Sequence, residues 1–356
     1  MDTIQNPDYF KGRGAQINTH NKFAAQRYVA DHIEGLDELF LEHSATELIE
    51  THPKKIISVN DSPDLSMGYS LNPYQGCEHG CIYCYARNAH EYWGYSAGLD
   101  FERKIIIKRN AAELLEQQFN APSYRPQVIM LSGNTDCYQP VERKLGITRA
   151  VLEVLYRYRH PVSIITKNDL ILRDIDILAD MAALRLVQVA ISLNSLNEEL
   201  RRKMEPRTVT AKGRLGVIRQ LSDAGIGVIV MCAPIIPGLN SDEIPAVIKT
   251  AAEHGARGAG YTIVRLNGAI GELFVDWVHK AYPDRAEKVL HQIAACHGGR
   301  LNDSRWEFRM RGDGEEASAI RQLFDLSVKR YMAGTPLPEL RLDLFTPRGG
   351  KQLHLF

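Results

Sequence analysis

The sequence has few cysteines and no long apolar run, and its charges cancel. Only 6 of the 356 residues are cysteine, which is too few to build a disulfide-stapled fold in a chain of this length. The 43 Lys and Arg residues balance the 43 Asp and Glu residues, so no strongly basic field indicates nucleic-acid binding, and only a local basic groove stays open. No stretch approaches a membrane span, and the polar start is not followed by a signal-peptide run. These absences predict a soluble, cytoplasmic protein with no membrane partner.

Between residues 67 and 266, short apolar runs rich in β-branched residues alternate with helical stretches. The expected strands are Met67–Leu71, Val128–Leu131, Val162–Thr166, Leu186–Leu193, Val228–Met231 and Ala259–Leu266. The expected helices are Ala111–Phe119, Ile147–Tyr158, Arg173–Ala183, Asn197–Met204, Ala211–Asp223 and Ile244–Glu253. Six β/α units imply a parallel sheet with crossover helices and a site at the carboxyl ends of the strands. The expected fold class is α/β, an open or partial (β/α)6 TIM-like barrel.

The rest of the chain divides around this core. Residues 1–60 read as an N-terminal extension, with an amphipathic helix expected from Lys22 to Leu48 because apolar residues recur there at helix-like intervals. Residues 61–275 form the barrel core. Residues 276–345 are expected to be mostly helical, and 346–356 to be a flexible tail that begins around the Gly349-Gly350 pair.

Three cysteines crowd into one short segment directly after the first expected strand. Cys77, Cys81 and Cys84 lie within eight residues, whereas the other three cysteines stand alone. This distribution indicates metal ligation in a reducing compartment. A [4Fe–4S] cluster is normally held by four thiolates, so three would leave one iron open to another ligand. The alternatives are a structural zinc with His79 as fourth ligand, since zinc accepts Cys₃His sites, or three unligated thiols.

The spacing Cys-x₃-Cys-x₂-Cys, with the aromatic Tyr83 before the last cysteine, resembles the signature of the radical S-adenosylmethionine (SAM) superfamily. The resemblance implies a [4Fe–4S] cluster on Cys77, Cys81 and Cys84 whose open iron binds the amino and carboxylate groups of SAM. Reduction by an electron donor such as flavodoxin or ferredoxin would cleave SAM to methionine and a 5′-deoxyadenosyl radical, which abstracts a hydrogen from substrate.

Further segments at strand ends resemble the spore photoproduct lyase branch of that superfamily over about residues 60 to 270. These segments are Ser132-Gly133-Asn134-Thr135-Asp136, Thr166-Lys167 and Ser192-Leu193-Asn194. The resemblance implies that Thr135 binds the amino group of SAM and that Lys167 and Ser192 meet its carboxylate, with Tyr83 and Asn194 in the same cofactor site.

Each of these residues has a structural alternative. Lys167 fits a solvated strand-end lysine, Thr135 a turn residue, and Ser192 or Ser195 a helix cap, because Ser195 to Glu198 match a capping box.

The match to the lyase fails at its hydrogen donor. In the lyase a cysteine stands two residues before the position of Thr135, and here that position is Gly133. Cys137 is a candidate replacement, although an isolated cysteine is commonly a small buried hydrophobe. Tyr83 and Tyr85 match the lyase tyrosines that take part in hydrogen return, so a radical relay stays open. The specific spore lesion is therefore not the expected substrate.

The chain ends Gln352-Leu353-His354-Leu355-Phe356, which resembles the short peptide that docks bacterial repair and replication proteins on the DNA sliding clamp. Gln352, Leu353, Leu355 and Phe356 would be the anchors. A related Arg341-Leu342-Asp343-Leu344-Phe345 occurs just upstream. The alternative is a tail that packs on its own core. If the C-terminal motif binds the sliding clamp, it indicates a function at DNA, independently of the resemblance to the lyase.

Two basic clusters lie near the expected site, Arg201-Arg202-Lys203 with Arg207, and Arg305, Arg309 and Arg311 around Trp306 and Phe308. Phosphate contact and base stacking need such residues, but interleaved glutamates favour a salt-bridged surface. We expect a radical SAM enzyme that acts on nucleic acid as a lyase-like repair enzyme. The alternatives are modification of a small molecule, peptide or RNA, and a non-catalytic, clamp-associated metal-binding module.

Overall fold

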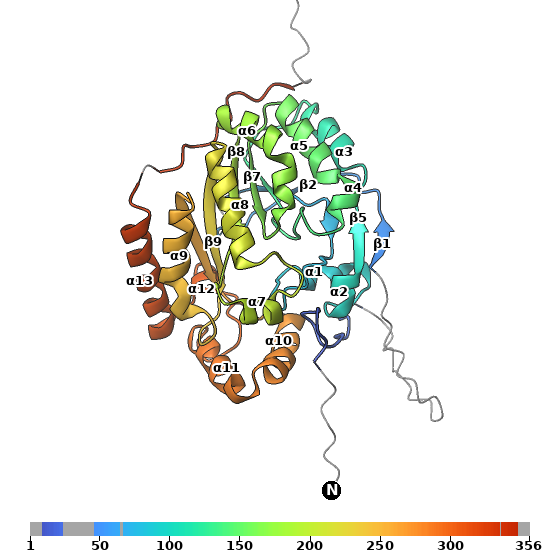
Figure 1. Ribbon diagram of the computed structural model, residues 1–356. Helices are drawn as coiled ribbons and strands as arrows, with labels where there is room; N and C mark the ends of the chain where they lie inside the picture. Colours follow the sequence, from blue (N-terminus) through green and yellow to red (C-terminus); the bar gives the residue numbers. More distant parts are fainter. Residues whose placement is uncertain (1–8, 24–45, 65–66, 335, 348–356) are drawn as a thin grey trace, which may run out of the picture.

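The computed structural model describes residues 9–23, 46–64, 67–334 and 336–347. Within these ranges, two sheets carry the fold (Figure 1), a seven-stranded sheet in the order β10-β9-β8-β7-β6-β3-β2 and a small sheet in the order β1-β5-β4. The strands of the large sheet are β2 (Ile57–Val59), β3 (Tyr69–Leu71), β6 (Ile129–Leu131), β7 (Val162–Thr166), β8 (Val187–Ser192), β9 (Gly227–Ile235) and β10 (Gly258–Ile263). Neighbouring strands from β3 to β10 are parallel, and β2 runs antiparallel to β3 at the edge. The prediction of an α/β fold built on six parallel strands is confirmed.

The central strands form because their side chains are buried on both faces. Val162 pairs with Val187 and Ile164 with Val189 across β7 and β8, and all four side chains are buried. Parallel strands that are covered on both faces are rich in apolar residues at successive positions. This composition made the segments recognisable as strands in the sequence.

Crossover helices connect the strands and cover the sheet. They are α3 (Ala111–Phe119), α4 (Glu142–Leu145), α5 (Ile147–Arg157), α6 (Ile175–Ala183), α7 (Glu198–Met204), α8 (Ala211–Asp223) and α9 (Ile244–Glu253). The cap of α7 is Asn197, whose side chain accepts hydrogen bonds from the backbone of Glu199 and Leu200. The alternative of Ser195 as this cap is wrong, because its hydroxyl donates to Glu243 instead.

The small sheet lies beside the cysteine segment. It contains β1 (Glu47–Glu50), β4 (Tyr74–Gln75) and β5 (Lys104–Ile107), with α1 (Arg87–His90) and α2 (Leu99–Arg103) between β4 and β5. Most of the helix expected from Lys22 to Leu48 lies outside the described residues. Its expected end is wrong, because Leu48 belongs to β1 and pairs with Ile105 in parallel register.

Helices dominate the chain after β10. They are α10 (Ala269–Ala281), α11 (Ala286–Ala295), α12 (Phe308–Arg311) and α13 (Gly314–Tyr331). Helix α13 packs against α9 (Figure 1). Within the described ranges, none of the helices is long and apolar enough to cross a membrane. The expected domain boundaries at 60, 275 and 345 stay predictions.

The segment 336–347 runs back to the large sheet. The Gln188 side chain donates to the carbonyl of Pro338 at 2.7 Å, and the Arg341 amide donates to the carbonyl of Arg185 at 2.9 Å. The ring of Phe345 contacts Phe119 and His160 with centroid distances of 5.5 and 5.3 Å. The upstream copy of the tail motif is therefore used in packing. Residues 348–356, including the terminal motif, lie outside the described part of the chain.

Candidate functional site

The cysteine loop follows β4 and is shaped by its own backbone. The Cys77 amide donates to the carbonyl of Phe101 at 2.9 Å, and the Cys84 amide donates to the carbonyl of Cys81 at 3.3 Å. Gly80 has a φ of +67°, and a Cβ there would lie 2.8 Å from a carboxylate oxygen of Glu102. A glycine is therefore required for this turn. Cys77 and Cys81 are buried, and Cys84 is half-buried.

A fully buried ion pair holds the loop in place. The Arg87 guanidinium lies 2.6 Å from the Glu102 carboxylate, and both side chains are 0% exposed. Arg87 also donates to the carbonyls of Cys81 at 2.9 Å and Gly80 at 3.1 Å. Glu102 in turn accepts from the amide of Ala15 at 2.8 Å. These bonds join the cysteine loop, α2 and the N-terminal segment into one unit.

A second set of contacts ties the loop to the strand ends. Asp136 accepts from the Thr166 hydroxyl at 2.8 Å and from the Lys167 amide at 2.9 Å, and it lies 3.4 Å from His79 Nδ1. Burial raises the pKa of Asp136, but His79 and the hydrogen bonds outweigh burial and hold the pKa below its usual value. His79 Nε2 lies 3.1 Å from the Asn168 amide nitrogen. Both ring nitrogens of His79 thus have partners.

The contacts of His79 help to decide whether the cysteine loop fits a zinc ion or an iron–sulfur cluster. Since His79 is engaged by Asp136 and Asn168, it is poorly placed as the fourth ligand of a zinc ion. The remaining cysteines are buried in the main hydrophobic core. Three thiols without a fourth fit a [4Fe–4S] cluster with one open iron.

A buried polar cluster lies on the other side of Tyr83. The Tyr83 hydroxyl donates to Glu205, and Glu205 forms an ion pair with Arg214. Arg214 also donates to the backbone carbonyl of Ser192 at 2.9 Å. Burial raises the pKa of Glu205, but Arg214 and Lys167 outweigh it and lower the pKa, so the group is a carboxylate. The cluster connects the cysteine loop to the carboxyl end of β8.

Four residues expected in the cofactor site lie near this cluster. The Lys167 ammonium is 6.0 Å from the centroid of the Tyr83 ring, and the Asn194 side chain donates to the Tyr83 hydroxyl at 3.5 Å. Ser192 is the last residue of β8 and is buried. The structure therefore brings Tyr83, Lys167 and Asn194 together, while their roles toward SAM stay predictions.

Thr135 lies at the end of the neighbouring strand β6. Its side chain is buried, and its hydroxyl donates to the carbonyl of Tyr74 at 2.7 Å. The hydroxyl proton is thereby committed, but the oxygen lone pairs stay available as acceptors. This geometry fits a group that accepts a hydrogen bond from an amino group.

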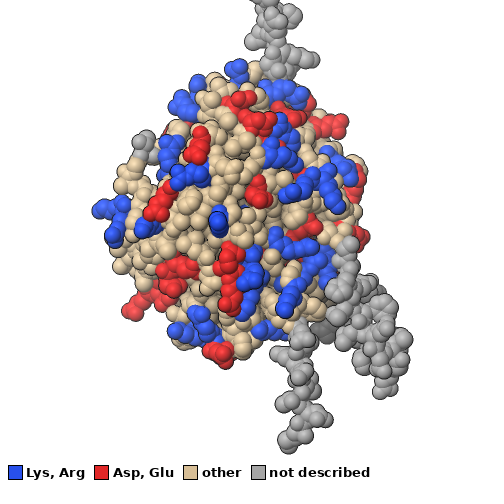
Figure 2. Space-filling view, in the orientation of Figure 1, with Lys and Arg blue, Asp and Glu red and all other residues tan. Residues whose placement is uncertain are grey.

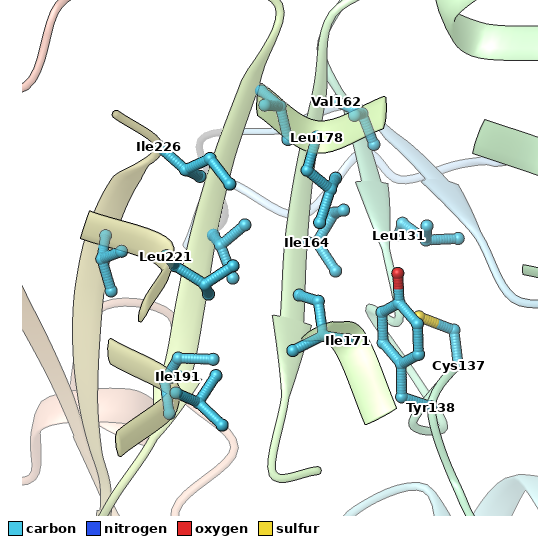
Figure 3. Close-up of a cluster of buried hydrophobic side chains, with 14 of the residues drawn as sticks. Leu131, Cys137, Tyr138, Val162, Ile164, Ile171, Leu178, Ile191, Leu221 and Ile226 are labelled. Atoms are coloured by element: carbon cyan, nitrogen blue, oxygen red, sulfur yellow. The ribbon is translucent and has the colours of Figure 1, made fainter. Parts of the chain in front are cut away.

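The structure separates the three candidates for hydrogen return. Tyr83 is buried, and its hydroxyl donates to Glu205. Tyr85 is 57% exposed, and its hydroxyl donates to the carbonyl of Gly133. Cys137 is 0% exposed and lies in the core among Leu131, Ile164 and Tyr138 (Figure 3). Burial raises the pKa of the Cys137 thiol well above its usual value. The surroundings of Cys137 are those of a small core residue.

A cavity of about 450 Å³ opens beside Tyr85. Its lining residues are Lys22, Tyr85, Asn88, Ala89, Tyr92, Asn134, Arg265, Asn267 and Gly268. These residues come from the N-terminal segment, the end of the cysteine loop, residues 88–92 and the loops after β6 and β10, so the cavity opens next to the cysteine loop.

The basic clusters singled out in the sequence are mostly ion-paired. Arg201 pairs with Glu198 at 2.7 Å, Arg305 pairs with Asp303 at 2.6 Å, and Arg309 pairs with Asp64. On the face shown in Figure 2, basic and acidic side chains are interspersed. All three arginines are therefore ion-paired, but only Arg305 is exposed, whereas the side chains of Arg201 and Arg309 are 9% and 17% exposed.

Four charged residues of the site were not found from the sequence: Arg87, Glu102, Glu205 and Arg214. Each is buried and acts through a partner of opposite charge. The sequence alone could not identify these four residues. Buried charges are almost always paired, but the sequence does not show which arginines and glutamates are buried.

Comparisons with known proteins agree with this geometry. A profile of the radical SAM superfamily matches residues 71–251. An uncharacterised protein of Mycobacterium tuberculosis is 33% identical over 228 residues, which cover 64% of this chain and 67% of that protein. An uncharacterised protein of Methanocaldococcus jannaschii is 28% identical over 197 residues, which cover 55% of this chain and 71% of that protein.

Among solved structures, spore photoproduct lyase complexed with dinucleoside spore photoproduct is similar with a TM-score of 0.60 and 14% identity. The match covers 81% of this chain and 80% of the lyase, so the two proteins share a fold. A double mutant of this lyase with bound SAM and dinucleoside spore photoproduct gives a TM-score of 0.57 and 16% identity, and the match covers 81% of this chain and 80% of the mutant. Because the superfamily profile spans more than half of this chain and includes the cysteine loop, the chain belongs to the radical SAM superfamily, whose cofactors are a [4Fe–4S] cluster and SAM.

Proposed function

We propose that this radical SAM enzyme acts on nucleic acid as a lyase-like DNA-repair enzyme. The observation that carries the proposal is the fold shared with spore photoproduct lyase over about four-fifths of both chains. Neither relative with sequence similarity has an assigned substrate. A cytoplasmic location, expected from the cysteine pattern, stays part of the proposal.

In this proposal the strand-end residues hold the cofactors. Cys77, Cys81 and Cys84 bind the cluster, and bound cluster and SAM supply a 5′-deoxyadenosyl radical. The Thr135 oxygen accepts a hydrogen bond from the amino group of SAM. Lys167 offers a compact cation for the carboxylate.

Three further residues complete the proposed cofactor site. Ser192 donates a hydrogen bond to the carboxylate of SAM from the end of β8. Tyr83 and Asn194 form the neighbouring wall, fixed by the hydrogen bond between them. Glu205 accepts from the Tyr83 hydroxyl and so keeps that ring oriented.

Tyr85 is the proposed hydrogen donor to the product. Bound SAM would supply the radical that removes a hydrogen atom from the substrate, and the rearranged substrate radical would then take a hydrogen atom from the Tyr85 hydroxyl. The O–H bond breaks, a C–H bond forms, and a phenoxyl radical is left. One electron from a flavodoxin- or ferredoxin-type donor and one proton from water restore the phenol. Tyr85 suits this role because it is exposed beside the cavity, whereas Cys137 is in the core.

The test is release of 5′-deoxyadenosine by the reconstituted enzyme with ultraviolet-irradiated DNA, compared with the same DNA without irradiation. The proposal expects stimulation by the damaged DNA. Equal release with both samples, or stimulation only by RNA, a peptide or a small molecule, would contradict DNA repair and leave the radical chemistry intact. No 5′-deoxyadenosine from the wild type, together with clamp binding that Cys77→Ala retains in full, would instead favour the non-catalytic binding module.

The sliding clamp is a second proposed partner, through Gln352, Leu353, Leu355 and Phe356. Phe345, in the upstream copy of the motif, packs on Phe119 and His160. Only the terminal copy is therefore proposed to dock. A clamp pull-down that is lost when residues 352–356 are removed would support this partner.

A further inference from the structure

Arg265 is a half-buried cation without a matching anion. It follows β10, and its Nε atom is buried with no hydrogen-bond partner among the described residues. Its Nη1 contacts the sulfur of Met310 at 3.4 Å, which is a weak acceptor. No ion pair of Arg265 is formed within the described part of the chain. An arginine stays charged even when partly buried, so this side chain loses hydration without a compensating partner.

The carboxylate whose charge acts on Arg265, Asp64, is already paired. Asp64 forms an ion pair with Arg309 and also accepts from the amide of Glu307 at 2.7 Å. Arg309 in turn lies over the ring of Trp306 at 3.9 Å. Burial lowers the pKa of Arg265, and the charge of Arg309 lowers it further. Arg265 is therefore the cation in this group that remains available for an anion.

The cavity beside Arg265 has the chemistry of a nucleotide site. Its nine lining residues include Lys22 and Arg265 but no carboxylate. Lys22 is partly neutralised by Glu91 at 3.5 Å, so Arg265 supplies most of the positive charge. The side-chain oxygen of Asn267 is buried with no hydrogen-bond partner among the described residues. A ligand with an anionic group and a hydrogen-bond donor would satisfy both side chains.

A pair of stacked aromatic rings, Tyr92 and Phe23, lies at one rim of the cavity. Tyr92 is 74% exposed, and its ring stacks on Phe23 with a centroid distance of 4.8 Å. Exposed aromatic rings beside cations are the arrangement by which proteins bind single-stranded nucleic acid, because every base offers a flat face for stacking. Phosphate contacts supply the charge-dependent part of the affinity.

We propose that Arg265 binds a backbone phosphate of a DNA strand, with Tyr92 stacking a neighbouring base and Asn267 accepting a hydrogen bond from the nucleotide beside Tyr85. This inference rests on the proposed function and names the residues by which its substrate is held. It is separate from the proposed carboxylate site of SAM, because Lys167 follows β7 whereas Arg265 follows β10, and β8 and β9 lie between these strands.

The test measures binding of a fluorescent single-stranded DNA octamer to the reconstituted enzyme at several salt concentrations. Arg265→Gln is expected to weaken binding about tenfold and to reduce the salt slope by about one. Arg265→Lys should keep the salt slope. Arg300→Gln, which removes an exposed arginine elsewhere, should bind as the wild type does. Tyr92→Ala should weaken binding about tenfold without changing the salt slope.

Competing ligands separate the possible sources of the anion. We expect deoxynucleoside monophosphate to compete with the DNA octamer for binding. Inorganic phosphate at equal ionic strength should not compete. SAM affinity should be the same in wild type and Arg265→Gln, and a selective loss of SAM binding in the variant would overturn the inference. If DNA stimulates the wild type and Arg265→Gln binds DNA normally, the phosphate site is wrong and the proposed function stands. If the wild type neither binds nor responds to DNA, both are wrong.

Discussion

The Tyr85 hydroxyl donates a hydrogen bond to the backbone carbonyl of Gly133. Position 133 is where the resemblance to spore photoproduct lyase leads one to expect the hydrogen-donor cysteine, and glycine offers no side chain there. The bond therefore places an exposed phenol against the position of the missing thiol. If Tyr85 is the hydrogen donor, as proposed, its loss should separate SAM cleavage from product formation.

The first prediction concerns Tyr85→Phe. The ring is kept and the O–H bond is lost, so the product formed per 5′-deoxyadenosine released should fall by at least about tenfold, while release itself changes by less than about threefold. Quantifying both compounds in one reaction checks the ratio. The matched variant Cys137→Ala removes a core thiol and should keep the wild-type ratio. Loss of product in Cys137→Ala with normal product in Tyr85→Phe would reverse the assignment.

The second prediction uses the space at Gly133. A Cβ there would meet the flexible Met130 side chain at 3.1 Å and Ser70 at 3.4 Å, so a small side chain requires only a slight shift. Gly133→Cys in the Tyr85→Phe background adds a thiol at the residue whose carbonyl the phenol contacts and should restore part of the product ratio. Gly133→Ala in the same background adds the Cβ without sulfur and should restore nothing. Equal behaviour of the two double variants would exclude hydrogen donation from this position.

The third prediction concerns the buried pair under the cysteine loop. Arg87→Met leaves the Glu102 charge buried and unpaired, which should lower the free energy of unfolding by about 3 to 5 kcal/mol. Iron bound per chain after reconstitution should fall as well, because Arg87 also holds the carbonyls of Gly80 and Cys81. Urea unfolding and iron analysis measure the two effects.

An exposed ion pair supplies the control for that measurement. Arg109 pairs with Glu50 at 3.0 Å, with side chains 49% and 44% exposed. Arg109→Met should therefore cost no more than about 1 kcal/mol and leave iron binding unchanged. A similar loss of stability in both variants would mean that the Arg87–Glu102 pair does not organise the loop.

The fourth prediction is a pH dependence of stability. His160 is buried with Nε2 2.8 Å from the Tyr124 hydroxyl and Nδ1 2.9 Å from the carbonyl of Pro161. Burial lowers the pKa of His160 to about 4, compared with about 6.5 in the unfolded chain. The unfolded chain therefore binds a proton first as the pH falls. The stability due to neutral His160 is complete above the unfolded pKa and is lost as the pH decreases toward about 4.

This loss should amount to about 2 to 3 kcal/mol between about pH 7 and pH 4.5. His160→Phe keeps an aromatic ring against Phe119 but has no proton to bind, so its free energy of unfolding should fall less steeply over the same range. His291→Gln changes an exposed histidine and should follow the wild type. Urea unfolding at several pH values gives the three curves, and parallel curves for wild type and His160→Phe would refute the assignment.

The large sheet was predictable because its central strands are buried on both faces. Val162–Thr166 and Val187–Ser192 are rich in Val and Ile, and nearly all of their side chains are buried, so composition marks them as strands. The strands that the sequence did not reveal are two to four residues long, such as β4 at Tyr74–Gln75. Leu48 was assigned to a helix because apolar spacing alone does not show that a short segment pairs with β5.

The cysteine loop was predictable for a different reason, since its ligands are adjacent in sequence and their spacing is a local property. The buried pairs of Arg87 with Glu102 and Arg214 with Glu205 depend on which charged residues the fold encloses, and this is decided by tertiary packing. The same holds for Arg265, which no sequence pattern distinguished from ion-paired arginines such as Arg309.

The central claim is that Cys77, Cys81 and Cys84 hold a cluster that cleaves SAM. The most direct measurement is formation of 5′-deoxyadenosine after anaerobic reconstitution with iron and sulfide and reduction in the presence of SAM. Wild type is compared with Cys81→Ala and with Cys232→Ala, which removes a buried thiol of the main core. We expect 5′-deoxyadenosine from the wild type and Cys232→Ala and none from Cys81→Ala. Equal product from Cys81→Ala, or stoichiometric zinc and no cluster in the wild type, would contradict the account.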